Sequence, residues 1–296
     1  MLLRIYASLN LLVKHSLLFM LLFCILTTAE RSYAFKHDFK VESIRISKSE
    51  FKLIAINDSP ATITFKTSIT GTNIRIGATA NSAHVIPPHS RREITRIERD
   101  VWNLSYKFHH DYKFWAGDIS FSPDRYYLYR LPFANGIQSR ISQAPGGTLT
   151  THLQPNSRYA IDFNLPEGTP VVAARTGVVI ALENRFTEGR YSQEMLDKAN
   201  YIEIMHQDRS IALYTHLSPH SNLVKIGQTV PAGKIIGYSG NTGFSGGPHL
   251  HFAVTHLIEH RDGSIVRESL PIKFFNHTPP RPVSIIDGST VTADYP

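Results

Sequence analysis

Short runs of alternating hydrophobic and polar residues, separated by turn-forming residues, fill the first third of the chain after its N-terminal segment. In residues 51–69 the runs FKLIAI and ATITFKTSI stand on either side of the turn sequence NDSP. Because successive side chains of a strand point to opposite faces, such alternation predicts strands with one buried face. Several short strands at this spacing are typical of a β-sandwich. We therefore expect a β-sandwich domain over residues 35–130.

The β character continues over residues 148–275, where glycine becomes frequent. The stretches EGTPVVAARTGVVI and VPAGKIIGYSGNTG are loosely similar and are typical of tight hairpins, in which glycine supplies the positive φ of each reversal. This predicts a compact antiparallel β domain and an all-β chain. Residues 131–147 are expected to be a linker, residues 188–199 a short helix, and the proline-rich residues 276–296 an irregular C-terminal tail.

The N-terminus has the pattern of an export signal. Residues 17–26 form an unbroken apolar run, Arg4 and Lys14 precede it, and the small residues around Ala34 suit a cleavage site. We expect a signal peptide over residues 1–34, or an uncleaved anchor that uses residues 11–29. Cys24 is the one cysteine of the chain, so the mature protein has no disulfide. Both alternatives place the protein outside the cytoplasm, in the periplasm or at the cell surface or exterior.

Composition and charge narrow the class of protein. Hydrophobic residues make up 42% of the 296 residues, which suits a globular protein and excludes disordered and collagen-like chains. The formal net charge of +7 favours anionic partners. The cations are spread without a block of Lys and Arg, and we expect no nucleic-acid partner.

Histidines and one aspartate carry the candidate chemistry. His249 and His251 lie two residues apart in the strand-like run HLHFAV, so their side chains share one face. Asp162 lies in the apolar run YAIDF, where a carboxylate needs a partner to offset its desolvation. His152 lies ten residues before Asp162. One His, this Asp and one more His would make three ligands and leave a fourth position for water, as in catalytic zinc sites.

Several motifs in a fixed order resemble those of the lysostaphin/LytM-type zinc metallopeptidases, which cut peptide bonds in the bacterial cell wall. The resemblance covers residues 152–275, a little under half of the chain. It rests on His152 followed by YAIDF (159–163), GTPV (168–171), LYTHL (213–217), GNTG (240–243) and GPHLHF (247–252).

The resemblance implies a role for each of five residues. It implies that His152, Asp162 and His251 bind one Zn²⁺ ion, and that His249 and His216 are the catalytic histidines. This division agrees with the chemistry of zinc, which makes hydroxide available near neutral pH. His249 would take the proton of the water and pass it to the leaving amine, and His216 would donate to the oxyanion.

The resemblance further implies an exported zinc metalloendopeptidase that acts on peptidoglycan peptides, with D-Ala–diaminopimelate cross-links as the expected substrate. Five weaker candidates for substrate binding lie next to the motifs: Asn200, Tyr201, Asn241, Thr242 and Ser245. The alternative is a non-catalytic relative that activates other wall hydrolases. We also hypothesise that the N-terminal domain limits access to the zinc cleft.

Overall fold

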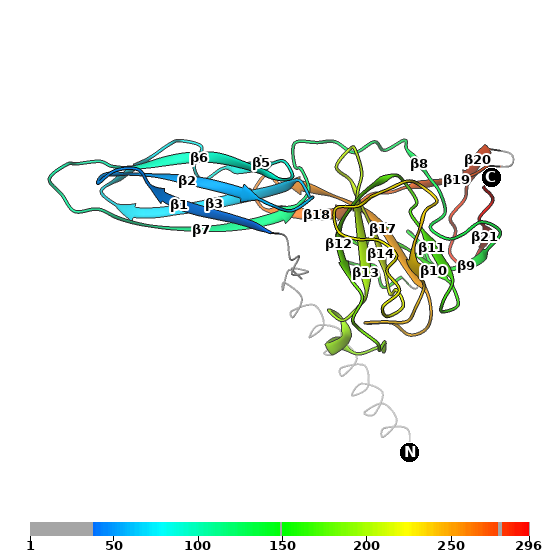
Figure 1. Cartoon of the computed structure of the whole chain (residues 1–296). Helices are drawn as coiled ribbons and strands as arrows, with labels where there is room; N and C mark the ends of the chain where they lie inside the picture. The colour runs from blue at the N-terminus through cyan, green and yellow to red at the C-terminus, as the bar shows by residue number, and fades with distance from the viewer. Residues whose placement is uncertain (1–37, 149, 278–279, 296) are drawn as a thin grey trace, which may run out of the picture. The chain divides into compact units, whose positions relative to one another are not determined.

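The computed structural model describes residues 38–148, 150–277 and 280–295 (Figure 1). Strands dominate these residues, and the regular helix among them is one 3₁₀ turn, η1 (Gln193–Met195). The prediction of an all-β chain is therefore confirmed. The expected signal peptide or anchor lies outside the described residues. Within the described ranges, no helix is both long and apolar enough to span a bilayer.

Residues 38–117, here called the N-terminal part, form two antiparallel sheets. One has the order β1-β2-β6-β4 and the other β5-β3-β7. Phe39 of the first sheet lies against Phe65 and Phe114 of the second, with ring centroids 5.1 and 5.0 Å apart, so residues of both sheets share one core. The strands are β1 (Phe39–Arg45), β2 (Glu50–Asn57), β3 (Ile63–Thr72), β4 (Ile74–Ile76), β5 (Ala83–Ile86), β6 (Ser90–Arg99) and β7 (Lys107–Ala116).

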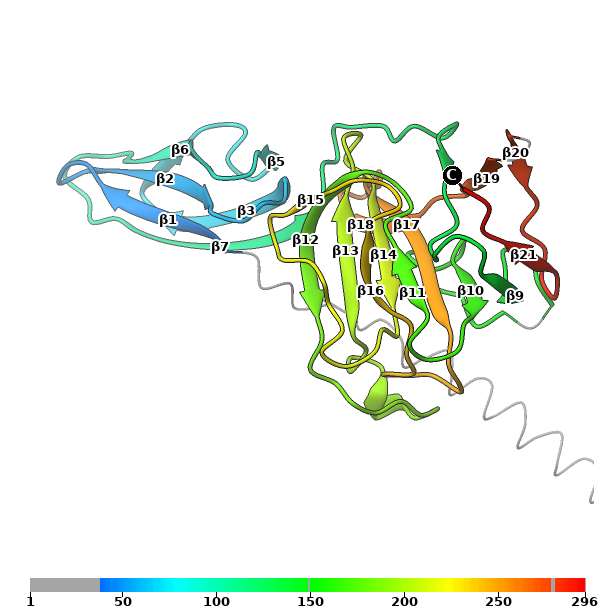
Figure 2. The same ribbon diagram turned by 45° about the vertical axis from the view of Figure 1, so that its right-hand side comes forward.

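Residues 118–295, here called the C-terminal part, are built on a nine-stranded sheet. Its order is β15-β12-β13-β14-β17-β10-β9-β21, and β18 pairs with β17 (Figure 2). Two smaller sheets, β11-β16 and β20-β19-β8, complete this part. The strands are β8 (Leu128–Tyr129), β9 (Gln138–Gln143), β10 (Ile161–Asn164), β11 (Pro170–Val172), β12 (Gly177–Glu183), β13 (Tyr201–Met205), β14 (Ile211–Thr215), β15 (Thr229–Val230), β16 (Ile235–Tyr238), β17 (Leu250–Glu259), β18 (Ile265–Ser269), β19 (Lys273–His277), β20 (Pro280–Val283) and β21 (Thr290–Thr292).

The segments expected to be a linker and an irregular tail belong to this part. In residues 131–147, strand β9 pairs with β10 and β21, and Leu131, Phe133 and Ile141 are fully buried. Near the C-terminus, the Tyr295 hydroxyl accepts a hydrogen bond from Leu131 N and donates one to Phe275 O. Both expectations are wrong. The glycine and proline content of these segments suggested loops, but their apolar side chains pack into the core of the C-terminal part.

The expected helix over residues 188–199 is also corrected, since only η1 is helical. Gly189 forms a bridge to Gly243, and Arg190 N donates to Gly243 O over 3.0 Å. A Cβ atom at Gly189 would lie 1.9 Å from Asn241 O. This close pairing with the glycine-rich loop of residues 240–247 holds the segment extended and prevents further helical turns.

The two parts share contacts within one compact unit, Lys36–Pro296. Ile180, Met205 and Ile211 of the C-terminal part join the core cluster of the N-terminal part. Lys66 Nζ lies 3.0 Å from Glu259 Oε1, and Arg267 Nη2 donates to Ala116 O over 3.2 Å. Residues 38–117 are thus packed against the end of β17 at Glu259.

Candidate metal centre

The centre is built on the pairing of β10 with β17. In this antiparallel pair Asp162 lies directly opposite His251, and directly opposite residues of paired strands point to the same face. His251 Nδ1 lies 2.9 Å from Asp162 Oδ1. The sheet therefore brings together two residues separated by 89 positions in the sequence.

His152 completes the cluster from the loop before β10. Its Nε2 lies 3.2 Å from Asp162 Oδ2, and its Nδ1 lies 3.2 Å from Ala160 O. A backbone carbonyl can only accept, so Nδ1 carries the proton and Nε2 presents a lone pair toward Asp162. The candidate ligand atoms of His152, Asp162 and His251 all lie within 4.8 Å of one another.

Burial controls the charge state of the cluster. Burial by itself would raise the pKa of Asp162, but the close imidazoles of His152 and His251 hold that pKa well below its usual range. Burial also lowers the pKa of His251, which keeps its imidazole neutral. An ionised carboxylate and neutral imidazoles are the forms that bind a metal ion, so a cluster of this composition suits a cation.

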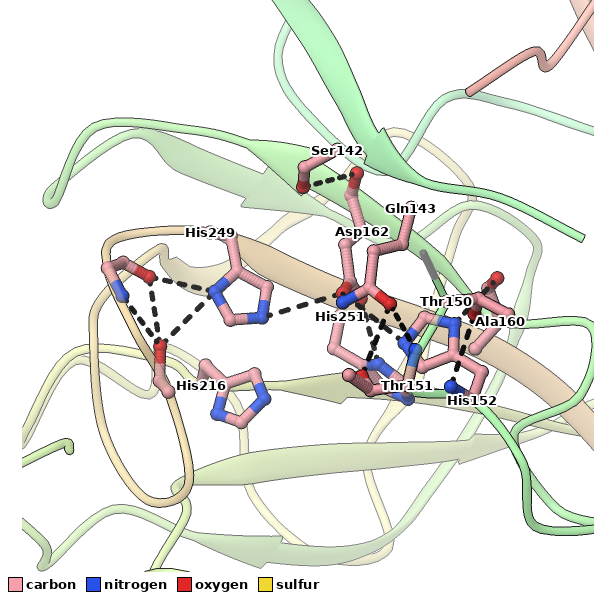
Figure 3. A network of polar contacts seen from close by, with 12 residues as sticks. Ser142, Gln143, Thr150, Thr151, His152, Ala160, Asp162, His216, His249 and His251 are labelled. Atoms are coloured by element: carbon pink, nitrogen blue, oxygen red, sulfur yellow. Dashed lines mark hydrogen bonds and ion pairs between the residues drawn. The ribbon is translucent and has the colours of Figure 1, made fainter. Parts of the chain in front are cut away.

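Strand β9 supports the cluster through a residue that the sequence analysis did not single out. Gln143 lies opposite Asp162 in the β9–β10 pair, and its Nε2 donates to Asp162 Oδ2 over 2.8 Å. Its Oε1 accepts from Thr151 N over 2.6 Å, next to His152 (Figure 3). Gln143 thereby links two candidate ligands. No sequence signal marked it, because residues 131–147 had the composition of a linker.

His249 and His216 face each other beside the cluster, with ring centroids 4.5 Å apart (Figure 3). His249 Nδ1 lies 2.8 Å from Gly247 O, and its Nε2 lies 3.9 Å from Asp162 Oδ2. His216 Nδ1 lies 2.6 Å from Thr242 O. Each Nδ1 therefore donates to a carbonyl, and in the neutral form of either ring the lone pair is on Nε2.

His216 occupies an unusual backbone conformation. Its φ of +66° lies in the left-handed region, which costs of order 1 kcal/mol or more for a residue other than glycine. Burial, followed by the nearby His249 and His251, lowers its pKa to about 3. The fold thus holds a neutral imidazole at this position in spite of an unfavourable backbone conformation.

The five weaker candidates for substrate binding differ in their hydrogen-bond partners. The Asn200 amide, fully buried, donates to Phe186 O and Leu217 O, and its oxygen accepts from Phe186 N. Thr242 Oγ1 accepts from Asn200 N and donates to Leu217 O. These protein partners favour a positioning role for both residues over contact with a substrate.

Ser245 and Asn241 lie at the Nδ1 edge of the His249 ring. Ser245 Oγ lies 3.2 Å from His249 Nδ1 and 2.6 Å from Asn241 Oδ1, so this pair supports the imidazole. Tyr201 is half-buried at the first position of β13.

A groove of about 610 Å³ opens beside the cluster. Asp162 and His249 line it together with Tyr191, whose ring lies against Gly246. The residues that line it are Ser142, Gln143, Asp162, Asn164, Leu165, Pro166, Tyr191, Gly246, Gly247, Pro248 and His249. Of the five residues of the predicted centre, Asp162 and His249 line this groove, and the other three lie close to these two.

An antiparallel β-sheet protein with a buried His–Asp–His cluster and two further histidines beside it has the donor set of a metal site. Residues 156–264 match the model of Peptidase family M23, and the chain therefore contains a Peptidase family M23 domain. The resemblance to the lysostaphin/LytM-type peptidases is confirmed. The matched range includes Asp162, His216, His249 and His251, and begins four residues after His152.

The chain is also similar in sequence to curated peptidases and metalloproteases. The chain is 37% identical over 111 residues to the peptidoglycan DD-endopeptidase ShyA of Vibrio cholerae, covering 38% of this chain and 23% of the relative. It is 34% identical over 114 residues to lysostaphin of Staphylococcus simulans, covering 38% and 20%. It is 42% identical over 94 residues to an uncharacterized metalloprotease of Buchnera aphidicola, covering 32% and 22%.

The chain thus spans about a fifth of the length of the curated relatives that it matches. Among solved structures, that of LytU is 35% identical, with a TM-score of 0.31, over 39% of this chain and 72% of the other.

Proposed function

We propose that this chain is an exported zinc metalloendopeptidase that hydrolyses peptide bonds in peptidoglycan, with D-Ala–diaminopimelate cross-links as substrate. The observation that carries the proposal is the convergence of His152, Asp162 and His251 on one point, beside His249 and His216, at an open groove. Relatives named as peptidoglycan DD-endopeptidases support the substrate class.

The donor set suits zinc. Two imidazoles and one carboxylate are ligands that Zn²⁺ takes in catalytic centres, where three protein ligands leave one position free. The described cluster has three members with this composition. When bound there, zinc supplies Lewis acidity that activates water and polarises the scissile carbonyl.

His249 is the proposed general base. Its Nδ1 is engaged with Gly247 O and Ser245 Oγ, which fixes the ring and leaves Nε2 as the proton acceptor. Nε2 points toward Asp162, on the side where the ligands converge. The same nitrogen can return the proton to the leaving amine once the peptide bond breaks.

His216 is the proposed partner of the developing negative charge. Its Nδ1 is held by Thr242 O, so it is Nε2 that would donate to the oxyanion, in the doubly protonated form of the ring. The ring of His216 is neutral in the free chain, so this donor requires the uptake of one proton from solvent as that charge develops.

The experiment uses residues 36–296, which form one compact unit, loaded with one equivalent of zinc. The protein is incubated with intact peptidoglycan of several wall types, and the released fragments are measured by mass spectrometry. We expect fragments cut at the D-Ala–diaminopimelate bond. They should disappear after chelation and fall at least 100-fold with His249→Ala, as expected for the loss of a general base.

The matched variants separate chemistry from metal binding. His249→Ala should still bind zinc, and His251→Ala should not, as measured by zinc content after gel filtration. Loss of zinc from His249→Ala would overturn the assigned roles. A folded, zinc-loaded chain that cuts no wall type would instead favour the non-catalytic activator of other hydrolases.

A further inference from the structure

One end of the N-terminal part exposes a cluster of large apolar side chains. Two loops meet there, residues 46–49 between β1 and β2, and residues 100–106 between β6 and β7; we call them the tip loops. The indole of Trp102 is 73% exposed, and Leu104 is 54% exposed. Of the described residues 38–117, the exposed large hydrophobic ones are all at this end: Ile44, Ile46, Val101, Trp102 and Leu104.

Hydrogen bonds join the two tip loops into one surface. Arg99 N donates to Ser49 O over 2.8 Å, and the Tyr106 hydroxyl donates to Lys48 O over 3.0 Å. The rings of Tyr106 and Phe51 lie 6.5 Å apart beneath them. The apolar residues of the two loops are therefore neighbours in space.

The second tip loop is held in one conformation by Asn73. The Asn73 amide donates to Val101 O, Leu104 O and Ser105 O, at 2.9 to 3.3 Å, and its oxygen accepts from Val101 N over 2.7 Å. Asn73 makes these bonds from a left-handed φ of +53°. The exposed side chains are thus preorganised, which reduces the entropy lost when they bind a partner.

Cations surround the apolar cluster. Arg45, Lys48, Arg99 and Lys107 lie in or next to the tip loops, and none of the ion pairs among the described residues involves them. The acidic residues in or next to these loops are Asp100 and Glu50, and Glu50 is paired with Arg96. The Arg99 guanidinium lies 5.3 Å from the Trp102 ring centre and 4.7 Å from that of Tyr106. An anionic partner would meet little opposing negative charge here.

The charge of the chain is also divided unevenly. Residues 36–117 contain 13 Lys and Arg against 8 Asp and Glu, whereas residues 118–296 contain 15 of each. After the N-terminal segment, the whole positive excess belongs to the part that carries the tip loops. Such asymmetry points to an anionic partner for that part alone.

We propose that the tip loops bind the surface of an anionic lipid bilayer. Trp102, Leu104 and Val101 enter the interface between head groups and acyl chains, where tryptophan is favoured, and the surrounding Arg and Lys side chains meet anionic head groups. The combination of inserted apolar residues with a cationic rim is what gives peripheral proteins their affinity for such membranes. This surface does not depend on the proposed peptidase activity.

Tryptophan fluorescence provides a direct test. The chain has two tryptophans, so Trp115→Phe in residues 36–296 leaves Trp102 as the sole reporter. This protein is mixed with vesicles of phosphatidylglycerol and phosphatidylethanolamine, or of phosphatidylcholine alone. We expect a blue shift of Trp102 emission and co-sedimentation with the anionic vesicles, both weakened by salt.

Variants with an unmutated Trp115 identify the surface. Trp102→Ser/Leu104→Ser should weaken co-sedimentation at least tenfold. Tyr126→Ser/Ile286→Ser, which removes two exposed apolar residues outside the N-terminal part, should leave it unchanged. Circular dichroism would confirm that both pairs of substitutions preserve the fold. Equal binding by the two double variants, no binding to anionic vesicles, or binding to purified peptidoglycan in place of vesicles would each overturn the proposal.

Discussion

Individual residues of the metal centre differ in how far the sequence reveals them. His152, Asp162, His216, His249 and His251 lie in recognisable motifs, and the structure brings all five together. Gln143 lies in no motif, although it donates to Asp162 and accepts from Thr151. Gln143 reaches Asp162 from the neighbouring strand. Which residues of two strands lie opposite each other depends on the register of the pair, and the local sequence does not encode that register.

Gln143→Leu is expected to weaken zinc binding about 10- to 100-fold, because the Asp162 carboxylate loses a hydrogen bond that orients it. Competition with a chelator of known affinity measures the change. Gln138→Leu, on the same strand and exposed, is the matched control. Equal zinc affinity for the two variants would show that Gln143 does not position Asp162.

At the scale of elements, the strands with clear alternation were predictable and the segments rich in glycine or proline were not. Strand β3 over Ile63–Thr72 follows the alternating run of residues 61–69. Strand β9 and strand β21 were missed, because their burial arises from the pairing of β9 with β10 on one side and with β21 on the other. Long-range pairing also explains why residues 188–199 form only one helical turn.

The turn between β13 and β14 contains a titratable group that links its elements. His206, fully buried, lies at the end of β13, and its Nδ1 donates to Thr176 O just before β12 over 3.0 Å. Burial lowers the pKa of His206 to about 4. Between pH 6.5 and 4 the unfolded chain therefore binds a proton that the folded chain does not.

From this single group, the free energy of unfolding should fall by up to about 3 kcal/mol as the pH decreases through that window, while above pH 6.5 the effect is absent. His206→Asn, which retains a donor near the position of Nδ1, should lose less stability between pH 7 and 4.5 than the unsubstituted chain. Urea unfolding at several pH values measures this. The exposed His220→Asn should behave like the unsubstituted chain, and an equal slope for His206→Asn would contradict the assignment.

At the scale of the whole molecule, the N-terminal part makes its contacts far from the metal centre. It packs near Glu259, and with about 3.3 Å per residue, eight residues of β17 separate this position from His251 by about 26 Å. The hypothesis that residues 35–130 limit access to the zinc cleft gains no support from these contacts. Composition and spacing could not reveal which end of the sheet the N-terminal part would meet.

Two truncations test this organisation. A chain that starts at Thr148 should not unfold cooperatively or retain zinc, because it lacks β9 and the buried Leu131, Phe133 and Ile141. A chain that starts at Ile119 should retain zinc and unfold at a lower temperature. Without the N-terminal part, the side chains of Ile180, Met205 and Ile211 become exposed to solvent. Its activity per zinc-loaded molecule should not rise. Higher activity from residue 119 would revive the access hypothesis.

The opposition of Asp162 and His251 across β10 and β17 also dictates the order in which the centre can form. A chain emerging N-terminus first presents His152 and Asp162 long before His251, and two ligands without the third make a weak site. Gln143 is 19 positions before Asp162, whereas His251 is 89 positions after it, so we expect the contact with His251 to form later than the contact with Gln143. For the proposed metal site, we therefore expect metal binding late in folding, and a chain that ends before β17 should not form the site.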